Sequence, residues 1–446
     1  MTWIIFLLFC CLIPANYGRS IAVNDADENA EQAKLNRFLS KKRILIELQA
    51  EIFGISLPPA SNETDIDKNP YIMEGDIVYT EEQLDILIED VRGQLFAKNH
   101  PEGPKQLSLT PNLAMRWTMP IPYYFDTWVN RTTILAGIRL WEQETCIRFT
   151  RKDSKPPGNS IQFITGSGCS SPVGMQGGAQ PVTLHPIACN TIATVVHEIA
   201  HSLGAWHEQS RSDRDSYVAI LSDNIPEGVY PANFGKKSTM DYGVGYDYGS
   251  VMHYAKNDFA IDTKKPTIIP RDPMMENVIG QRVGLSFFDV KRMNLAYCNA
   301  ICKNTLPCQN YGYVNPNNCN VCKCPPPYGG KLCDRFQQSG CGDFTLTATS
   351  SSKTITASGA KTCYFFITAP PGKKIQFKML DQRLYDYLGL CKYSYVEVKV
   401  KRDFTKYGPR FCKLPPPVLL SETNEAMIVF QGYFSTNSFT MEYRSV

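Results

Sequence analysis

The sequence has little of several features that mark whole classes of protein. Its formal net charge is only +3 and its basic residues are dispersed, so nothing indicates binding to nucleic acid. After the first part of the chain, no apolar run reaches the roughly 20 residues that a membrane-spanning helix needs. This argues against a transmembrane protein. Histidine is scarce, with 6 in 446 residues, and three of them fall between residues 197 and 207.

The start of the chain has the pattern of a secretory signal. An apolar run from Trp3 to Ile13 is followed by Pro14 and Ala15, although the usual basic residue near the start is missing. The run is too short to cross a bilayer. We therefore predict that residues 1–20 are a signal peptide and that the protein is secreted to the extracellular space.

Cysteine is absent from residues 21–111 and frequent after them. Two of the 16 cysteines, Cys10 and Cys11, belong to the signal, and those that remain are even in number, as expected for disulfides in an oxidising compartment. The others gather in residues 112–300, 301–334 and 341–446. Chain length and this clustering predict several domains in series.

Residues 21–111 have a helical pattern. One amphipathic helix is indicated by the spacing of Leu35, Phe38, Leu39 and Leu48. Thr80 opens a second helix as part of a capping box with the glutamine three residues later. The buried face of this second helix is expected to contain Leu84, Leu87, Ile88, Val91 and Leu95.

The strongest chemical signal is the run His197-Glu198-x-x-His201-x-x-Gly204-x-x-His207. Residues four apart share a helix face, so His197 and His201 can bind one metal ion with Glu198 beside it. Gly204 tolerates a positive φ and can end the helix, which would return His207 as a third ligand. Three ligands and an open position are typical of catalytic zinc. The alternative, histidines hydrogen-bonded on a helix face, is disfavoured by the specificity of the full motif.

A second motif, Ser250-Val-Met252-His253-Tyr254, follows downstream. The two motifs together are those of metzincins, and residues 207–218 and 250–254 closely resemble the astacin family of zinc endopeptidases. The chain departs from the family pattern at Ala205, where a bulkier residue is usual, and at Ser212, where proline is frequent. Neither position is expected to contact the metal. The resemblance implies an α+β catalytic domain with one Zn²⁺ ion per chain.

The resemblance also assigns roles to individual residues. Met252 would form an apolar floor beneath the imidazoles, and Tyr254 would be a displaceable zinc ligand that later donates a hydrogen bond to the oxyanion. Glu198 would take a proton from the zinc-activated water and pass it to the leaving amine. Considered alone, a methionine is more often core filling and a tyrosine a buried aromatic. The remaining histidines, His100, His185 and His253, are expected to be ordinary.

The run Met73-Glu74-Gly75-Asp76 is similar to the astacin propeptide motif, with Met73 in place of the usual aromatic. In that motif the aspartate, here Asp76, fills the open zinc position. Residues 21–111 would then be a propeptide, and the protein would be made as a latent zymogen. The alternative is an ordinary turn at Gly75 and Asp76.

Activation would require a cut between Arg92 and Asn112, where no dibasic or furin-like signal occurs. In astacins the new N-terminus reaches the glutamate that follows the third histidine, which is Glu208 here. The alternative reading of Glu208 is an ordinary carboxylate at a helix exit.

Residues 112–300 are expected to form the catalytic domain. Ile134, Ile138 and Trp141 make a helical stripe, while residues 147–150 and 160–164 alternate like strands, which predicts a sheet packed on a helix. Counting alone allows three pairings of the four cysteines. The resemblance selects Cys146 with Cys298 and Cys169 with Cys189.

Residues 301–334 are too few to fold without cross-links. The spacing that ends at Cys333 resembles an EGF-like module, and no acidic calcium-binding sequence precedes Cys302. The resemblance implies three disulfides, Cys302 with Cys319, Cys308 with Cys322 and Cys324 with Cys333.

Residues 341–446 contain short alternating segments, typical of an all-β sandwich. The cysteines and the Cys-Gly opening are similar to a CUB domain, which implies the pairs Cys341 with Cys363 and Cys391 with Cys412. Many CUB domains hold calcium through an aspartate before a Tyr-[Leu/Val]-Glu strand. Ser394 stands there instead, and the loop at Asn437 offers no acid, so calcium is doubtful. The module is expected to contact proteins.

The resemblance as a whole, to secreted nematode astacins with EGF-like and CUB modules, implies a zinc endopeptidase that cleaves extracellular proteins. Matrix or cuticle substrates are suggested by analogy. One alternative is a processing protease for secreted growth factors or their inhibitors. Another is an inactive adhesion protein, against which the intact zinc and catalytic residues argue. Asn-x-Thr sequences predict N-glycosylation at Asn62 and Asn130.

Overall fold

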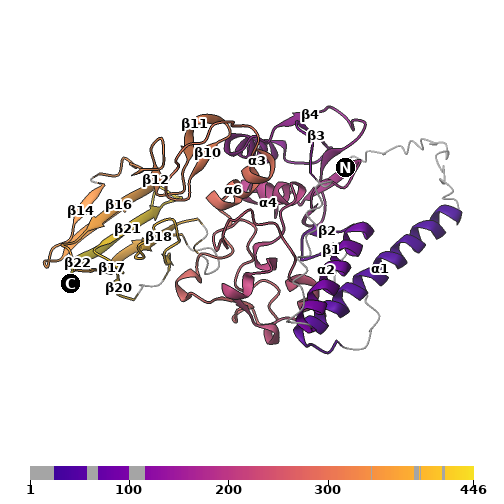
Figure 1. Ribbon diagram of the computed structural model, residues 1–446, viewed down its shortest axis with the longest axis horizontal. Helices are drawn as coiled ribbons and strands as arrows, with labels where there is room; N and C mark the ends of the chain where they lie inside the picture. The colour runs from indigo at the N-terminus through magenta and orange to yellow at the C-terminus, as the bar shows by residue number, and fades with distance from the viewer. Residues whose placement is uncertain are drawn as a thin grey trace, which may run out of the picture.

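A computed structural model describes residues 25–57, 69–99, 116–342, 344–385, 391, 393–413 and 417–446. Figure 1 shows the parts of the chain in sequence order along the long axis, from a helical N-terminal segment through a central domain to a β-sandwich. Within the described ranges, no helix combines the length and the apolar character that crossing a membrane requires. The signal region, Asn62, His100 and the part of the expected cut region from residue 100 to 112 lie outside the described residues.

The N-terminal segment is built on two helices, α1 (Asp25–Phe53) and α2 (Glu81–Asn99). The capping box begins α2 as the sequence predicts, because Thr80 N–H donates to Gln83 Oε1 and Gln83 N–H donates to Thr80 Oγ1. All five apolar residues expected on the inner face of α2 are buried. Four of them, Leu84, Leu87, Ile88 and Val91, pack with Phe38 and Leu45 of α1 in one core.

The N-terminal segment also contains a hairpin that the sequence did not predict. Between the helices, β1 (Ile72–Met73) and β2 (Ile77–Val78) form a short antiparallel hairpin. β2 also pairs in parallel with β6 (Cys169–Pro172) of the central domain. Strands of two residues leave no periodic pattern, and their pairing partner is distant in sequence. The hairpin therefore depends on tertiary contacts that local sequence does not reveal.

The central domain is organised around one mixed sheet. Its strand order is β1-β2-β6-β7-β5-β3-β4, in which the pairs β7/β5, β5/β3 and β3/β4 are parallel and β6/β7 is antiparallel. Its own strands are β3 (Ile121–Phe125), β4 (Phe149–Arg151), β5 (Ser160–Ile164), β6 (Cys169–Pro172) and β7 (Ala179–Leu184). The strand expected over residues 147–150 is thus shifted toward the C-terminus.

Helices α3 (Arg131–Glu144) and α4 (Ile192–Ser202) pack on the sheet. The expected stripe of Ile134, Ile138 and Trp141 is buried in their common core. Gly137 lets the helices approach closely, since a Cβ there would lie 2.5 Å from Val195 Cγ1. The remaining elements of this domain are η2 (Glu208–Ser210), η3 (Arg214–Ser216), β8 (Val218–Ile220), η4 (Ser222–Asn224), α5 (Val229–Phe234), β9 (Ile268–Pro270), η5 (Pro273–Met275) and α6 (Phe287–Tyr297).

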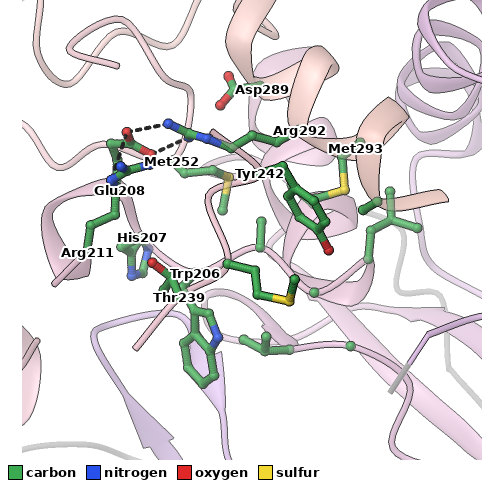
Figure 2. A pocket seen from close by; sticks show the side chains of 18 of the residues that line it. Trp206, His207, Glu208, Arg211, Thr239, Tyr242, Met252, Asp289, Arg292 and Met293 are labelled. Carbon is green, nitrogen blue, oxygen red and sulfur yellow. Dashed lines mark hydrogen bonds and ion pairs between the residues drawn. The ribbon is translucent and has the colours of Figure 1, made fainter. Parts of the chain in front are cut away.

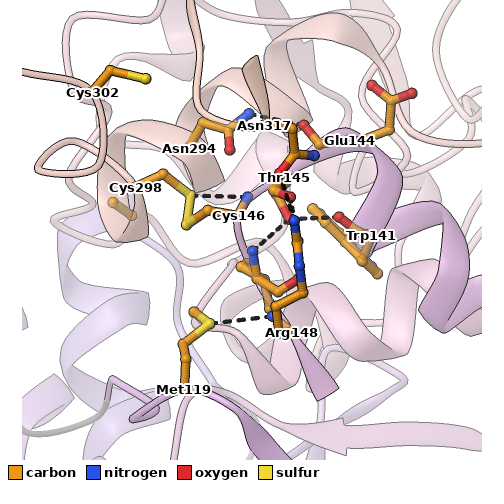
Figure 3. The surroundings of a disulfide bond; sticks show 12 residues. Met119, Trp141, Glu144, Thr145, Cys146, Arg148, Asn294, Cys298, Cys302 and Asn317 are labelled. Carbon is orange, nitrogen blue, oxygen red and sulfur yellow. Dashed lines mark hydrogen bonds between the residues drawn. A yellow bond between two sulfur atoms is a disulfide. The ribbon is translucent and has the colours of Figure 1, made fainter. Parts of the chain in front are cut away.

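A disulfide closes the central domain. Cys146, just after α3, bonds to Cys298, just after α6, as Figure 3 shows. Cys169 and Cys189 form the second disulfide of this domain. Both pairs are those that the family resemblance implies.

The cysteine-rich segment lies against the end of α3. Asn317 Nδ2 donates to the carbonyls of Glu142 and Gln143, and its Oδ1 accepts from Arg148. The strands of this segment are β10 (Tyr313–Asn315), β11 (Asn318–Lys323), β12 (Tyr328–Gly329) and β13 (Arg335–Phe336). Its disulfides join Cys302 to Cys319, Cys308 to Cys322 and Cys324 to Cys333, the same pairs as expected.

The C-terminal part is a sandwich of two sheets around an apolar core. One sheet has the order β14-β16-β21-β18-β19 and contains β14 (Thr345–Thr347), β16 (Thr362–Thr368), β21 (Glu425–Gln431), β18 (Tyr395–Lys399) and β19 (Arg410–Phe411). The other has the order β15-β22-β17-β20 and contains β15 (Lys353–Ser358), β22 (Ser438–Ser445), β17 (Ile375–Arg383) and β20 (Leu419–Leu420). Cys341 bonds to Cys363 and Cys391 to Cys412, again as expected.

Candidate metal centre and catalytic site

Helix α4 places the first two histidines. Thr191 caps the helix by accepting from Thr194 N–H, and Val195, Val196 and Ile199 anchor its inner face in the core. His197 and His201 are both buried, and their Nε2 atoms lie 3.2 Å apart. The helix thus presents two imidazoles to one point in space.

The chain reverses after α4 and returns the third histidine. Gly204 has φ +104°, a conformation that L side chains rarely adopt, which is why glycine suits this position. His207 then lies with its ring centroid 4.8 Å from that of His201 and 5.6 Å from that of His197. The three histidines of the motif therefore meet as the spacing predicts.

Each imidazole is oriented through its Nδ1 atom. Nδ1–H of His197 donates to Val251 O and that of His201 donates to Ala205 O, both at 2.8 Å. Nδ1–H of His207 donates to Glu74 Oε2 at 2.9 Å. Such outer partners fix the tautomer of metal-binding histidines and leave each Nε2 lone pair for the metal.

Asp76 of the N-terminal segment completes the group. Its carboxylate oxygens lie 3.1 Å from His197 Nε2 and 3.1 Å from His207 Nε2. The candidate ligand atoms of Asp76 and the three histidines all lie within 4.8 Å of one another. Asp76 Oδ1 is buried and makes no hydrogen bond. Gly75, at φ +82°, forms the turn that aims this carboxylate at the histidines.

This donor set fits a tetrahedral zinc ion. Zinc–nitrogen bonds of about 2.0–2.1 Å place the corners of a tetrahedron about 3.3 Å apart, close to the separations found here. Burial lowers the pKa of His197 to about 3, which keeps it neutral as a metal ligand must be. Although burial opposes it, the carboxylates of Asp76 and Glu74 raise the pKa of His207 to about 9. The negative charge that causes this shift also suits a divalent cation.

Glu198 lies beside the ligand group on the same helix. It is buried, and its Oε2 atom makes no hydrogen bond. Burial, and then the negative charge of Asp76, raises the pKa of Glu198 well above its usual value. A buried carboxyl with an unpartnered oxygen is a typical candidate for a general base.

The second motif lies beside the histidines, since the Tyr254 ring centroid is 4.6 Å from that of His207. Met252 is buried in the core of the domain, and its carbonyl accepts from Glu208 N–H at 3.1 Å. The Tyr254 hydroxyl donates to the backbone carbonyl of Glu74 at 2.6 Å, so in this structure it contacts the N-terminal segment. The expected role of Tyr254 as a displaceable zinc ligand stays a prediction.

The other described histidines have ordinary roles. His253 is buried, donates from Nδ1 to the carbonyl of Tyr254 and contacts the Tyr246 hydroxyl through Nε2. Nδ1 of His185 accepts from the backbone N–H groups of Ile187 and Ala188. Neither belongs to the metal-binding group.

Glu208 has partners that the sequence did not reveal. Arg292 of α6 donates to its two carboxylate oxygens over 2.5 and 2.7 Å, and Asp247 N–H donates to Oε1 at 2.7 Å. Figure 2 shows this pair at the edge of a cavity of about 220 Å³ that Met252 and Met293 also line. Arg292 lies many residues after the predicted strands and motifs. No local sequence pattern indicates that it pairs with Glu208.

Glu74 is the second functional residue that the sequence reading missed. Its buried carboxylate accepts from Lys237 Nζ, Ser210 Oγ, Tyr79 OH and His207 Nδ1. Although burial acts in the opposite direction, the charges of Lys237 and His207 lower the pKa of Glu74 to about 2. The sequence signal that could have identified Glu74 was its position between Met73 and the Gly75-Asp76 turn.

Asn130 is exposed and caps α3 by accepting from Thr133 N–H, while its Nδ2 donates to Asn190 Oδ1. Its glycosylation stays a prediction.

Comparison with known proteins agrees with this geometry. The chain matches the family model for astacin, a peptidase family, over residues 109–298 and the model for the CUB domain over residues 341–443. Zinc metalloproteinase nas-34 of Caenorhabditis elegans is 43% identical over an alignment of 464 residues, which covers 98% of this chain and 76% of that protein.

Other relatives are longer. Zinc metalloproteinases nas-30 and nas-37 of Caenorhabditis elegans are 38% and 37% identical over 80% and 84% of this chain, which spans only 48% of each of them. Among solved structures, High choriolytic enzyme 1, a hatching enzyme zinc-protease from Oryzias latipes (Medaka fish), is 33% identical with a TM-score of 0.40. That match covers 42% of this chain and 97% of that chain.

Proposed function

Because the chain belongs to the astacin family of zinc metalloproteinases, we propose that it is secreted as a latent precursor and, once processed, hydrolyses peptide bonds of extracellular proteins. The observation that carries the latent state is the contact of the Asp76 carboxylate with the Nε2 atoms of His197 and His207. With its carboxylate there, Asp76 would keep a substrate carbonyl away from an ion held by these histidines. Residues 1–20 would be the signal and residues 21–111 the propeptide.

When bound, zinc supplies Lewis-acid chemistry, polarising the scissile carbonyl and lowering the pKa of water toward about 7. His197, His201 and His207 hold it. Glu198, with one oxygen that makes no hydrogen bond, accepts the proton of the attacking water and passes it to the leaving nitrogen.

Tyr254 has a role that its contact with the N-terminal segment supports. Its hydroxyl donates to the carbonyl oxygen of Glu74, which is a peptide carbonyl two residues from the carboxylate at the metal ligands. After that segment leaves, a substrate carbonyl takes the same place. Tyr254 is then positioned to donate to the oxyanion as negative charge develops.

Activation requires a cut that releases the N-terminal segment. Arg92 and Lys98 both lie within the helix α2, whereas proteolytic cuts concentrate in exposed loops. We therefore place the cut after Asn99. The cavity of about 220 Å³ beside Glu208 offers room for a new N-terminus, as the family resemblance implies.

The modules after the catalytic domain complete the proposal. The CUB domain is expected to contact proteins, and residues 301–334 would be an EGF-like module. Fourteen cysteines paired in seven disulfides within the described chain support an oxidising, extracellular compartment.

The test uses the full chain with a specific protease site inserted between residues 104 and 105, so that processing is controlled. Glu198→Ala should keep stoichiometric zinc and lose peptide cleavage by on the order of 10²–10⁴-fold. Glu227→Ala, an exposed glutamate of the same domain, is the matched control and should cleave normally. A Glu198→Ala enzyme that cleaved like the unaltered one would refute the mechanism.

Substrate identity needs a second experiment. New N-termini generated in native extracellular material by the processed enzyme, and absent with Glu198→Ala, identify the targets. Matrix or cuticle fragments would support the proposed substrate class, whereas growth-factor precursors or their inhibitors would replace it.

A further inference from the structure

The CUB domain contacts the catalytic domain at Gly249, three residues before Met252. Its Tyr407 lies directly on the backbone of Gly249, because a Cβ at Gly249 would sit 2.2 Å from Cζ of the tyrosine ring and 2.3 Å from its hydroxyl. Gly249 does not have a positive φ, so its backbone conformation does not require glycine. The absence of a side chain there serves the close approach of Tyr407.

Gly249 belongs to residues 247–252, which we call the methionine segment. Gly249 N–H donates to Asp247 Oδ1, and its carbonyl accepts from Gln281 Nε2. Two residues later, the carbonyl of Val251 accepts from Nδ1–H of His197 at 2.8 Å. The backbone on which Tyr407 rests therefore carries the group that orients a zinc ligand.

Tyr407 is itself held firmly. The guanidinium of Arg410 lies 5.1 Å from the centre of its ring, and Lys399 Nζ lies 5.7 Å from it. Both cations are paired with the buried carboxylate of Glu397, at 3.0 and 2.9 Å. Glu397 also accepts from Gly408 N–H, the residue after Tyr407. This network fixes Tyr407 at the edge of its sheet where β18 and β19 lie.

Further contacts fix the orientation of the whole CUB domain. Lys401 forms an ion pair with Asp272, and Asn277 Nδ2 donates to the carbonyl of Arg410 at 3.1 Å. Met274 of η5 packs against the apolar core of the sandwich. In Figure 1 the sandwich accordingly has β18 on the side nearest the central domain. A recognition module on a free tether would need none of these contacts.

We propose that the CUB domain contributes to catalysis, and that Tyr407 is a positioning residue that holds the methionine segment, whose Val251 carbonyl orients the zinc ligand His197. The inference rests on the proposed peptidase function. It predicts a contribution of the CUB domain to the rate of cleavage of short peptides, which are too small to reach a separate recognition surface.

The experiment compares Tyr407→Ala with Tyr407→Phe and with Tyr433→Ala. Tyr433 is an exposed tyrosine of the same domain that packs on Tyr393 and Phe434. Two readouts are used: amide hydrogen exchange of the peptide covering the methionine segment in the full precursor, and kcat and KM of the processed enzyme on a short peptide.

Tyr407→Ala should speed exchange in this peptide by on the order of tenfold. It should also lower kcat by on the order of tenfold while KM stays constant. A slightly misplaced zinc ligand slows the chemical step but does not weaken the binding of substrate. Tyr407→Phe, which keeps the ring, should retain the unaltered values of both, as should Tyr433→Ala.

Gly249→Ala tests the same contact by a substitution in the catalytic domain. It remains a test of the proposal if Tyr407→Ala fails to fold. Its added methyl meets the Tyr407 ring, so it should lower kcat by a similar factor. In a Tyr407→Ala protein, the space of the ring is empty. Adding Gly249→Ala to that protein should therefore lower kcat by a much smaller factor.

Exchange and kcat that stay unaltered in both Tyr407→Ala and Gly249→Ala would overturn the inference and leave the peptidase function intact. A fall in kcat without faster exchange would also overturn it, because the effect would not run through the methionine segment. If the unaltered processed protein cleaves no peptide, the proposed function fails, and the exchange measurement still decides whether Tyr407 holds this segment.

Discussion

Arg292 binds the carboxylate of Glu208 with both of its terminal nitrogens, at 2.5 and 2.7 Å. Glu208 directly follows the histidine that completes the metal group, and Arg292 belongs to α6, the last helix of the catalytic domain. The Glu208 side chain is buried, and the Arg292 side chain is only 15% exposed. The pair therefore joins the metal centre to the disulfide-bonded end of the domain.

Loss of Arg292 should destabilise the precursor strongly. Arg292→Met leaves the buried Glu208 carboxylate with only the more distant Arg211, whose Nε lies 3.9 Å away, and the loss is expected to cost about 3–5 kcal/mol of unfolding free energy. Denaturant unfolding of the Glu198→Ala precursor, in which proteolysis cannot interfere, measures this. Arg335→Met removes an exposed arginine and should change little. Equal stability of the two variants would contradict the assigned role of the pair.

Replacing Asp76 should weaken latency. Asp76→Ala removes a charged group from the metal position, so the unprocessed chain should cleave short peptides at least about tenfold faster than the unaltered precursor, which corresponds to about 1.4 kcal/mol of lost blocking. The control is Asp85→Ala, which removes an exposed carboxylate of the same N-terminal segment. A precursor that stays as silent as before would show that steric cover by the segment, and not Asp76, maintains latency.

The CUB domain should be indifferent to calcium. Ser394 Oγ donates directly to Asn437 Oδ1 at 2.8 Å, and that oxygen also accepts from the N–H groups of Tyr433 and Phe434. These side-chain bonds join the two loops where an aspartate would hold calcium in many CUB domains. Asn437→Ala should cost about 1–3 kcal/mol because buried groups lose their partner.

Thermal unfolding with and without added calcium tests whether the CUB domain responds to calcium. No chelator is used, because a chelator would also remove zinc. A rise in the midpoint of the CUB transition with calcium would contradict the prediction.

Stability should fall as the pH rises through about 7. Burial, and then the carboxylates of Asp289 and Glu208, raise the pKa of Asp247 to about 7, although Arg292 opposes them. An unfolded aspartate titrates near about 3.9, so the folded state binds this proton more tightly. The stabilisation is therefore fully present below the unfolded value and is lost as the pH passes the folded value.

Unfolding midpoints of the Glu198→Ala precursor between about pH 5 and about pH 8 measure this slope. Asp247→Asn should flatten it, whereas Asp153→Asn, at an exposed position, should leave it unchanged. A profile that Asp247→Asn did not alter would assign the titration to another group.

The histidine ligands and their helix could be predicted because the information is local. His197, His201 and Gly204 lie within one helix and its exit turn, where spacing determines geometry. The capping box of α2 is local in the same way. The disulfide pairs required the family resemblance, since counting cysteines left several pairings open.

The contacts that tune the site could not be predicted from local pattern. Lys237 and its partner Glu74 are 163 residues apart, and Arg292 lies 84 residues from Glu208. Tyr407 reaches Gly249 from a different domain. A single charged or aromatic residue carries no periodic signal, so each of these pairs emerges only when packing has brought the segments together. The β1/β2 hairpin was missed for the same reason.

The most direct test of the central claim is a zinc measurement on the processed enzyme, coupled to cleavage. The account predicts one zinc ion per chain, loss of peptide cleavage on thorough chelation, and recovery when zinc is returned. A processed protein without stoichiometric zinc, or one that still cleaves peptides after complete removal of metal, would contradict it.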